Sequence, residues 1–139
     1  MNGRYELFDH TADAGVRAFA PTLPELVPPA VAGLYAVIGR LTPTPSREPA
    51  QFNLTGEDAA MLLRDLLAEL LTRLMIEGKM AVDWQVREFT PARLSALAWL
   101  SSVDRAASEF QREAKGVTYH QLAVRPVAGG YEATFIVDI

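Results

Sequence analysis

The segment EDAAMLLRDLLAELLTRLMIEG, residues 57–78, constrains the fold of this 139-residue chain more than any other. Its apolar residues recur every three or four positions and form one wide stripe, made of Ala59, Leu62, Leu63, Leu66, Leu67, Leu70, Leu71 and Leu74. A stripe this wide is typical of a helix buried against a sheet and is too wide for a strict coiled-coil seam. The sequence therefore predicts a long helix that ends at Gly78 and follows a capping box, with Thr55 as the cap and Asp58 returning.

A second helix is predicted before the loop TPTPSREP at residues 42–49. Thr22 and Glu25 have the spacing of a capping box. The apolar residues that follow have a helical period and are Leu26, Val27, Ala30, Val31, Leu34, Val37 and Ile38. Pro28 and Pro29 interrupt this pattern, and each removes a backbone donor. We therefore expect a kink or a late helix start there.

Apolar runs and alternating patterns predict strands at residues 5–8, 14–20, 51–54, 80–89, 93–100, 116–127 and 131–138. Residues 101–113 are polar and indistinct, and predict either a loop or a short helix. Long helices interleaved with hairpins favour a single α+β domain over residues 1–139. Its two main helices are expected to pack on one face of a mixed or mostly antiparallel sheet, which makes two layers.

The last two strands are predicted to form a hairpin around Ala128-Gly129-Gly130. If the loop is symmetric about the two glycines, Val124 lies opposite Phe135 and His120 lies opposite Ile139. A loop of odd length would shift this register by one residue.

Composition excludes several kinds of site and partner. The chain has no cysteine, which rules out disulfides, thiolate metal sites and cysteine nucleophiles and suits a cytoplasmic location. A net charge of −4 lacks the basic footprint of an autonomous nucleic-acid binder, so a role with RNA would run through a partner. No signal peptide is apparent, and no apolar stretch reaches the roughly 20 residues of a membrane span, so no membrane contact is expected.

Carboxylates gather near both ends of the sequence. Asp9 and Asp13 flank the short segment between the first two predicted strands, and the chain ends in Asp138-Ile139. If these ends meet, Asp13, Asp138 and the α-carboxylate of Ile139 provide three oxygen donors suited to Ca²⁺ or Mg²⁺. The alternative is that Asp9 and Asp13 cap turns and Asp138 is a solvated strand end.

The two histidines, His10 and His120, do not suggest zinc, because neither has a cysteine or second histidine nearby. Thr118 and His120 would share one face of a strand, which leaves a small threonine hydrolase as one interpretation and a structural histidine as the other. The sequence has no nucleophile elbow and no phosphate-binding glycine loop.

Three motifs in register resemble the archease family: HTAD at residues 10–13, KGVTYH at residues 115–120 and the terminal DI. The resemblance covers essentially the whole chain. It implies a non-enzymatic cofactor of an RtcB-type RNA ligase in tRNA splicing or RNA repair. Such a cofactor promotes guanylylation of the active-site histidine of the ligase by GTP, and lets the ligase turn over repeatedly. GTP and Mn²⁺ belong to the ligase, and RNA is contacted only through it.

The resemblance also implies roles for individual residues. Asp13, Asp138 and the Ile139 carboxylate correspond to the metal ligands of the family, and Lys115 to its functionally important lysine. The other motif residues are His10, which would shape its loop, and Thr118, Tyr119 and His120.

The sequence departs from the family in three places. Leu100-Ser101 replaces a Gly-Glu pair, Ser108 stands where a histidine is frequent, and Pro28-Pro29 interrupts a helix. Asp104 or Glu109 would have to substitute for the missing glutamate. The alternative function is a diverged, metal-stabilised binding module for another protein partner.

Overall fold

The computed structural model of the chain describes residues 3–10 and 13–139. Its elements in chain order are β1 (Arg4–His10), β2 (Asp13–Ala20), the 3₁₀ helix η1 (Pro24–Leu26), α1 (Val27–Ile38), β3 (Gly39–Arg40), β4 (Glu48–Thr55), α2 (Ala59–Glu77), β5 (Lys79–Phe89), β6 (Arg93–Ser102), β7 (Glu109–Phe110), β8 (Gly116–Val117), β9 (Ala123–Val127) and β10 (Gly130–Asp138). Within these residues, no helix is long and apolar enough to cross a membrane.

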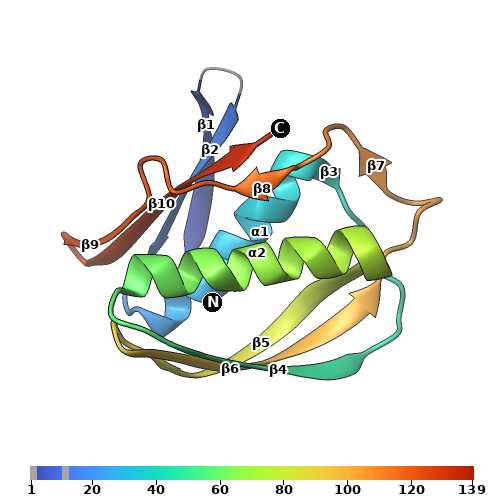
Figure 1. Cartoon of the computed structure of the whole chain (residues 1–139). Coiled ribbons are helices and arrows are strands. Elements are labelled where there is room, and N and C mark those ends of the chain that lie inside the picture. The colour runs from blue at the N-terminus through green and yellow to red at the C-terminus, as the bar shows by residue number, and fades with distance from the viewer. Residues whose placement is uncertain (1–2, 11–12) are drawn as a thin grey trace.

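The two α-helices lie between two antiparallel sheets (Figure 1). One sheet has the order β1-β2-β10-β8, with β9 also paired to β10, and the other has the order β4-β6-β5. The α+β class with mostly antiparallel strands is therefore confirmed, but the expected single sheet is divided into these two sheets and a separate β3-β7 pair. The reason is the wide apolar stripe of α2, which packs against β5 and β6 on one side and β8 and β9 on the other. Buried side chains of both sheets and both helices join in one core cluster.

Helix α2 begins and ends with local caps. Asp58 is the N-cap, and its Oδ1 accepts a hydrogen bond from the Ala60 amide at 2.8 Å. The predicted capping box was wrong, because Thr55 is held in β4 opposite Arg93 and cannot cap the helix. The predicted end is confirmed: Gly78 has a φ of 66°, in the left-handed region that glycine adopts without strain.

Helix α1 starts late, as the two prolines predict. The chain first makes η1, and Pro28 and Pro29 then fall in the first turn of α1, where their missing amide donors break no helical bond. The Glu25 amide donates to Thr22 Oγ1 at 3.4 Å, and the Thr22 hydroxyl donates to Glu25 Oε1 at 2.9 Å. Gly33 lets α1 approach β2 closely, because a Cβ there would lie 2.5 Å from a methyl carbon of Val16.

The strand predicted at residues 116–127 is not continuous. It is divided into β8 and β9 by a turn over residues 118–122, where Gln121 has a φ of 54°. His120 lies in this turn and not opposite Ile139. Of the polar residues 101–113, the first two end β6, and residues 103–113 form a loop that includes the short strand β7 and no helix.

The register of the last hairpin also differs from the prediction. Val127 pairs with Gly130, so the loop consists of Ala128 and Gly129 only. As a result Val124 lies opposite Ala133 and not opposite Phe135. The shorter loop moves every pair of β9 and β10 by two residues, which keeps each side chain on its expected face.

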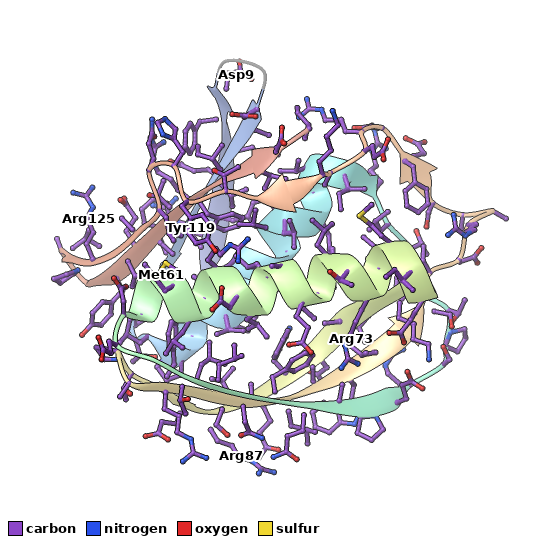
Figure 2. The ribbon with its side chains drawn as sticks, in the orientation of Figure 1. Asp9, Met61, Arg73, Arg87, Tyr119 and Arg125 are labelled. Carbon is purple, nitrogen blue, oxygen red and sulfur yellow. The ribbon has the colours of Figure 1, made fainter. Side chains whose placement is uncertain are left out.

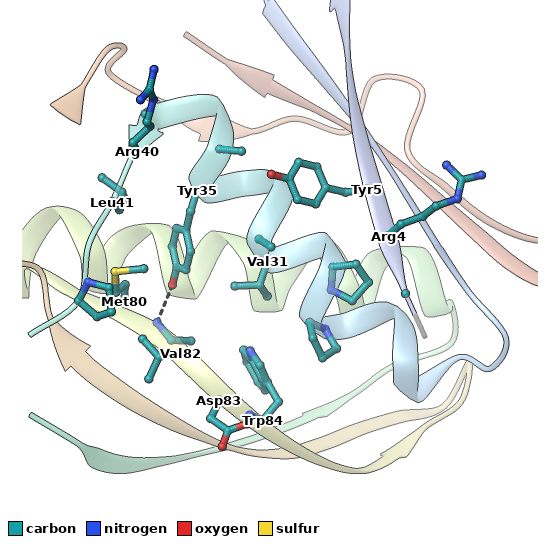
Figure 3. Close-up of a pocket in the computed structure, with 18 of the residues that line it drawn as sticks. Arg4, Tyr5, Val31, Tyr35, Arg40, Leu41, Met80, Val82, Asp83 and Trp84 are labelled. Carbon is teal, nitrogen blue, oxygen red and sulfur yellow. Dashed lines mark hydrogen bonds between the residues drawn. The ribbon is translucent and has the colours of Figure 1, made fainter. Parts of the chain in front are cut away.

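Tyr35 connects α1 to the second sheet. Its buried hydroxyl accepts a hydrogen bond from the Ala81 amide of β5 at 2.9 Å (Figure 3). Ala81 adjoins an irregularity in the β5–β6 ladder, where the pairing shifts between Ala81 and Asp83. The tyrosine therefore satisfies a backbone donor at the edge of this sheet.

We expect Tyr35→Phe to lower the free energy of unfolding by about 1–3 kcal/mol, because the buried Ala81 amide loses its acceptor. Denaturant titration measures the change. The control is Tyr119→Phe, because Tyr119 is 59% exposed, and its effect should stay within about 0.5 kcal/mol. A Tyr35→Phe protein as stable as the wild type would contradict the assigned role of the hydrogen bond.

Alkaline pH gives a second test of Tyr35. Burial raises the pKa of its phenol from 10.0 to about 12, against the opposing effect of the Ala81 hydrogen bond. The unfolded chain therefore loses the phenol proton more easily than the folded protein. The contribution of neutral Tyr35 to the free energy of unfolding is present below pH 10 and is lost as the pH rises toward 12. Over that interval the wild type should lose about 2–3 kcal/mol more unfolding free energy than Tyr35→Phe. Parallel pH profiles of the two proteins would contradict this.

Candidate functional site

Strands β2 and β10 bring two aspartates together at one end of their sheet. Asp13, the first residue of β2, lies directly opposite Asp138, the last residue of β10. On the other side of β10, Asp138 lies opposite Gly116 of β8. The beginning and the end of the sequence therefore meet, which the three-carboxylate interpretation requires. The role of these residues as metal ligands stays a prediction.

The two aspartates share the sheet face that points away from the helices. Their neighbours Ala14 and Val137 are buried in the core, and successive strand residues alternate between faces. Directly opposed residues have Cβ atoms roughly 4.5–5.5 Å apart, at which distance like charges destabilise the pair. Within the described residues, no lysine or arginine forms an ion pair with the Asp138 carboxylate.

Ile139 keeps a third carboxylate near this pair. Its half-buried side chain packs against the hydrophobic core, so the residue after β10 is held in place. The α-carboxylate of Ile139 follows Asp138 directly in the chain. We call Asp13, Asp138 and the Ile139 carboxylate the acidic tip.

Backbone hydrogen bonds on both sides of β8 hold this strand against the end of β10. The Lys115 amide donates to the Asp138 carbonyl at 2.7 Å, and the Thr118 amide donates to the Ile136 carbonyl at 2.9 Å. The side chain of Lys115 is exposed and forms no ion pair with any residue in the described part of the chain. The backbone of Lys115 is thus fixed beside Asp138, while its ammonium forms no ion pair with a described residue.

Residues 118–120 form a turn and not a strand, so the expected shared face of Thr118 and His120 was wrong. The Thr118 hydroxyl oxygen accepts a hydrogen bond from the His120 backbone amide at 3.2 Å. This contact shapes the turn and does not involve the imidazole ring, so it gives no support to a threonine–histidine hydrolase. Tyr119 and His120 are both exposed.

The two outer residues of the HTAD motif, His10 and Asp13, end β1 and begin β2. The backbone of His10 pairs with Asp13, whereas Thr11 and Ala12 lie outside the described residues. Asp9 pairs with Ala14 and therefore belongs to the other face of the sheet from Asp13. Asp9 is a strand residue and not the turn residue that the sequence suggested.

The position of the missing family glutamate is far from the tip in the fold. Leu100 and Ser101 lie near the end of β6, which belongs to the sheet on the other side of the helices from β10 (Figure 1). Ser101 is buried, and its Oγ donates to the Ser46 carbonyl and accepts from Arg47.

Asp104 and Glu109, the two candidates to replace the missing glutamate, make local contacts. Ser108, where the family frequently has a histidine, does so too. Asp104 Oδ1 accepts from the amides of Ala106 and Ala107 at 3.1 Å, and Glu109 lies 3.9 Å from Arg40. Ser108 Oγ accepts from the Thr42 amide at 2.8 Å.

One set of contacts to the segment of residues 115–120 could not be predicted from the sequence. Arg64, on the polar face of α2, donates from Nε to the Val117 carbonyl at 3.0 Å. Its guanidinium also lies over the Tyr119 ring, 4.4 Å from the ring centre. The helical period placed Arg64 opposite the apolar stripe but gave no sign of this partner. Figure 2 shows Tyr119 above α2.

The large cavity of the described structure lies elsewhere. It has a volume of about 1070 Å³ and lies beside α1, between the start of β1 and the edge of β5 (Figure 3). Tyr5, Val31, Tyr35 and Trp84 are among the residues that line it. Among the predicted site residues whose side chains the structure describes, none lines this cavity.

Comparison with known proteins gives the family. A model of the archease protein family (MTH1598/TM1083) matches residues 5–139, nearly the whole chain. The chain belongs to the archease family. It is 31% identical over 140 residues to protein archease of Pyrococcus abyssi, which covers 98% of this chain and 99% of that protein.

Two solved structures have the same fold. Protein 1598 of Methanobacterium thermoautotrophicum is 26% identical, with a TM-score of 0.73 over 97% of this chain and 98% of that one. An archease from Thermotoga maritima, described as a possible chaperone, is 16% identical, with a TM-score of 0.69 over 96% of both chains. The second likeness supports the archease fold alone.

The donors at the tip fit a hard cation. Among the described residues, no group of three His, Cys, Asp or Glu side chains gathers closely enough to hold a metal. A cation there would need the Ile139 carboxylate in addition to Asp13 and Asp138. Such an all-oxygen set suits Ca²⁺ or Mg²⁺, which complete their shells with water.

Without a divalent cation, we expect Asp138→Asn to raise the free energy of unfolding by about 0.2–1 kcal/mol, because it removes repulsion from the opposed Asp13. Thermal unfolding in a chelating buffer measures this. Asp9→Asn, on the other sheet face, is the matched control and should not gain stability. A loss of stability in Asp138→Asn under these conditions would contradict the repulsion.

Proposed function

We propose that this protein is a non-enzymatic cofactor of an RtcB-type RNA ligase. In this role it promotes guanylylation of the ligase's active-site histidine by GTP and allows multiple turnover in tRNA splicing or RNA repair. The observation that carries the proposal is the pairing of Asp13 with Asp138 across β2 and β10 in a chain of the archease family. The proposal keeps the cytoplasmic location expected from the cysteine-free composition.

Asp13, Asp138 and the Ile139 carboxylate would hold a Ca²⁺ or Mg²⁺ ion at the tip. When bound, the ion supplies positive charge that offsets the repulsion of the three carboxylates. The GTP and Mn²⁺ of the reaction remain with the ligase. The chain's own residues order the tip: the β2–β10 ladder sets the aspartate pair, and the core contact of Ile139 holds the last carboxylate.

The surface around the tip suits contact with a charged active site. Lys115 is exposed and forms no ion pair with a described residue, so its ammonium is available for a phosphate or carboxylate of the complex. The net charge of −4 disfavours direct binding to RNA and favours contact through the ligase.

A second candidate function is a binding module for another protein partner. The serine at position 101 favours it, because Ser101 is buried and bonded to Ser46 and Arg47, where the family pattern expects a glutamate. The description of the Thermotoga maritima structure as a possible chaperone is compatible with either partner.

Purified protein mixed with an RtcB-type ligase, GTP, Mn²⁺ and an RNA that ends in a cyclic phosphate tests the first function. Guanylylated ligase and joined RNA per ligase are measured. We expect the wild type to raise both, and Asp13→Asn, Asp138→Asn and Lys115→Ala to reduce the stimulation at least about tenfold, which is the loss of one charged contact. Asp9→Asn is the control and should stimulate fully. Absence of stimulation by the wild type would favour the second function.

Addition of calcium chloride tests the cation separately. The wild-type melting temperature should rise with Ca²⁺ concentration, because a ligand that binds only the folded state stabilises it. Asp138→Asn should show a much smaller rise, and Asp9→Asn a full one. Equal calcium shifts in all three proteins would place the ion away from the tip.

A further inference from the structure

We propose that Arg64 is a positioning residue, which holds the turn of residues 118–122 so that Tyr119 is presented as an exposed anchor for the partner protein. The proposal rests on the proposed ligase-cofactor function, because the partner is taken to be the ligase. It concerns α2, an element that carries none of the motifs of the functional site.

Arg64 makes both of the contacts that such a role needs. Its Nε donates to the carbonyl of Val117, the last residue of β8, at 3.0 Å. The same guanidinium lies over the ring of Tyr119, 4.4 Å from the ring centre. One side chain therefore fixes the end of β8 and the aromatic ring two residues later.

The guanidinium is itself held in position. Its Nη1 lies 3.1 Å from Asp65 Oδ1, and only 22% of the Arg64 side chain is exposed. Partial burial strengthens a cation–π contact relative to a fully exposed one. The ammonium of a lysine could not donate to Val117 and cover the ring with a planar group at once.

Tyr119 has the properties of a contact residue and not of a core residue. Its side chain is 59% exposed, although the ring lies against a fixed cation. Exposed tyrosines that are already ordered lose little conformational entropy on binding, and tyrosine is enriched among residues that dominate binding energy. Met61, three residues before Arg64 on α2, is also 37% exposed.

The turn that carries Tyr119 is connected directly to the acidic tip. Val117 pairs with Val137, and the Thr118 amide bonds to the Ile136 carbonyl, two residues before Asp138. A partner that contacts the tip would therefore meet Tyr119 on an adjoining part of the same surface. The aromatic contact would supply affinity, while the tip acts on the ligase.

The test measures stimulation of the ligase over a range of concentrations of this protein. We expect Arg64→Met to raise the concentration for half-maximal stimulation about tenfold, because the turn released from its cation–π contact and hydrogen bond must be ordered when the partner binds. Maximal stimulation at saturation should be unchanged, because the acidic tip is intact. Arg64→Lys should resemble Arg64→Met.

Arg73→Met is the matched control. Arg73 also lies on α2 and covers an aromatic ring, that of Phe52, 5.2 Å from its centre, but it packs on the other sheet. It should leave the half-maximal concentration unchanged. If both variants lower the melting temperature to a similar extent but only Arg64→Met raises the half-maximal concentration, Arg64 positions the turn and does not merely stabilise the fold.

Tyr119→Ala closes the test and does not depend on the folding of Arg64→Met. It should raise the half-maximal concentration as much as Arg64→Met, and the double variant should add nothing further. The inference is overturned if the wild type stimulates and both single variants match its half-maximal concentration. Failure of the wild type to stimulate is a different result and would overturn the proposed function.

Discussion

The structure depends on the central position of β10. This strand pairs with β2 along one edge and with β8 and β9 along the other, and its buried residues close the core against the helices. Phe135 and Val137 are fully buried on that side. The ladder that builds the core therefore also sets the positions of Asp138, Lys115 and Asp13, so packing and the candidate site have one cause.

Electrostatics and packing act in opposite directions at the acidic tip. Cross-strand register places Asp13 and Asp138 opposite one another, which costs stability unless a counter-charge is present. The hydrophobic contacts of Ala14, Val137 and Ile139 hold the strands in this register regardless. The core therefore imposes the register that brings these two carboxylates together.

Local signals in the sequence predicted the features that depend on nearby residues. The stripe of α2, its end at Gly78 and the late start of α1 at Pro28-Pro29 all follow from spacing and backbone chemistry. Features set by distant partners were missed. Thr55 matched a capping pattern, but its pairing in β4 decides its role.

In the candidate site too, the sequence predicted some residues and missed others. The motifs identified Asp13, Asp138 and Lys115, and the structure brings these residues together. The turn at residues 118–122 could not be predicted, because its positive φ falls on Gln121 and not on a glycine. Arg64 was missed because its partners, Val117 and Tyr119, lie more than fifty positions away in the sequence.

The place of β10 in the sheet has a consequence for biosynthesis. A ribosome produces β2 early and β10 after every other element, yet β10 lies between β2 and the strands β8 and β9. Until it emerges, β2 exposes an unpaired edge, the core is open, and Asp13 has no carboxylate opposite it. A nascent or prematurely terminated chain thus presents neither the acidic tip nor a finished sheet.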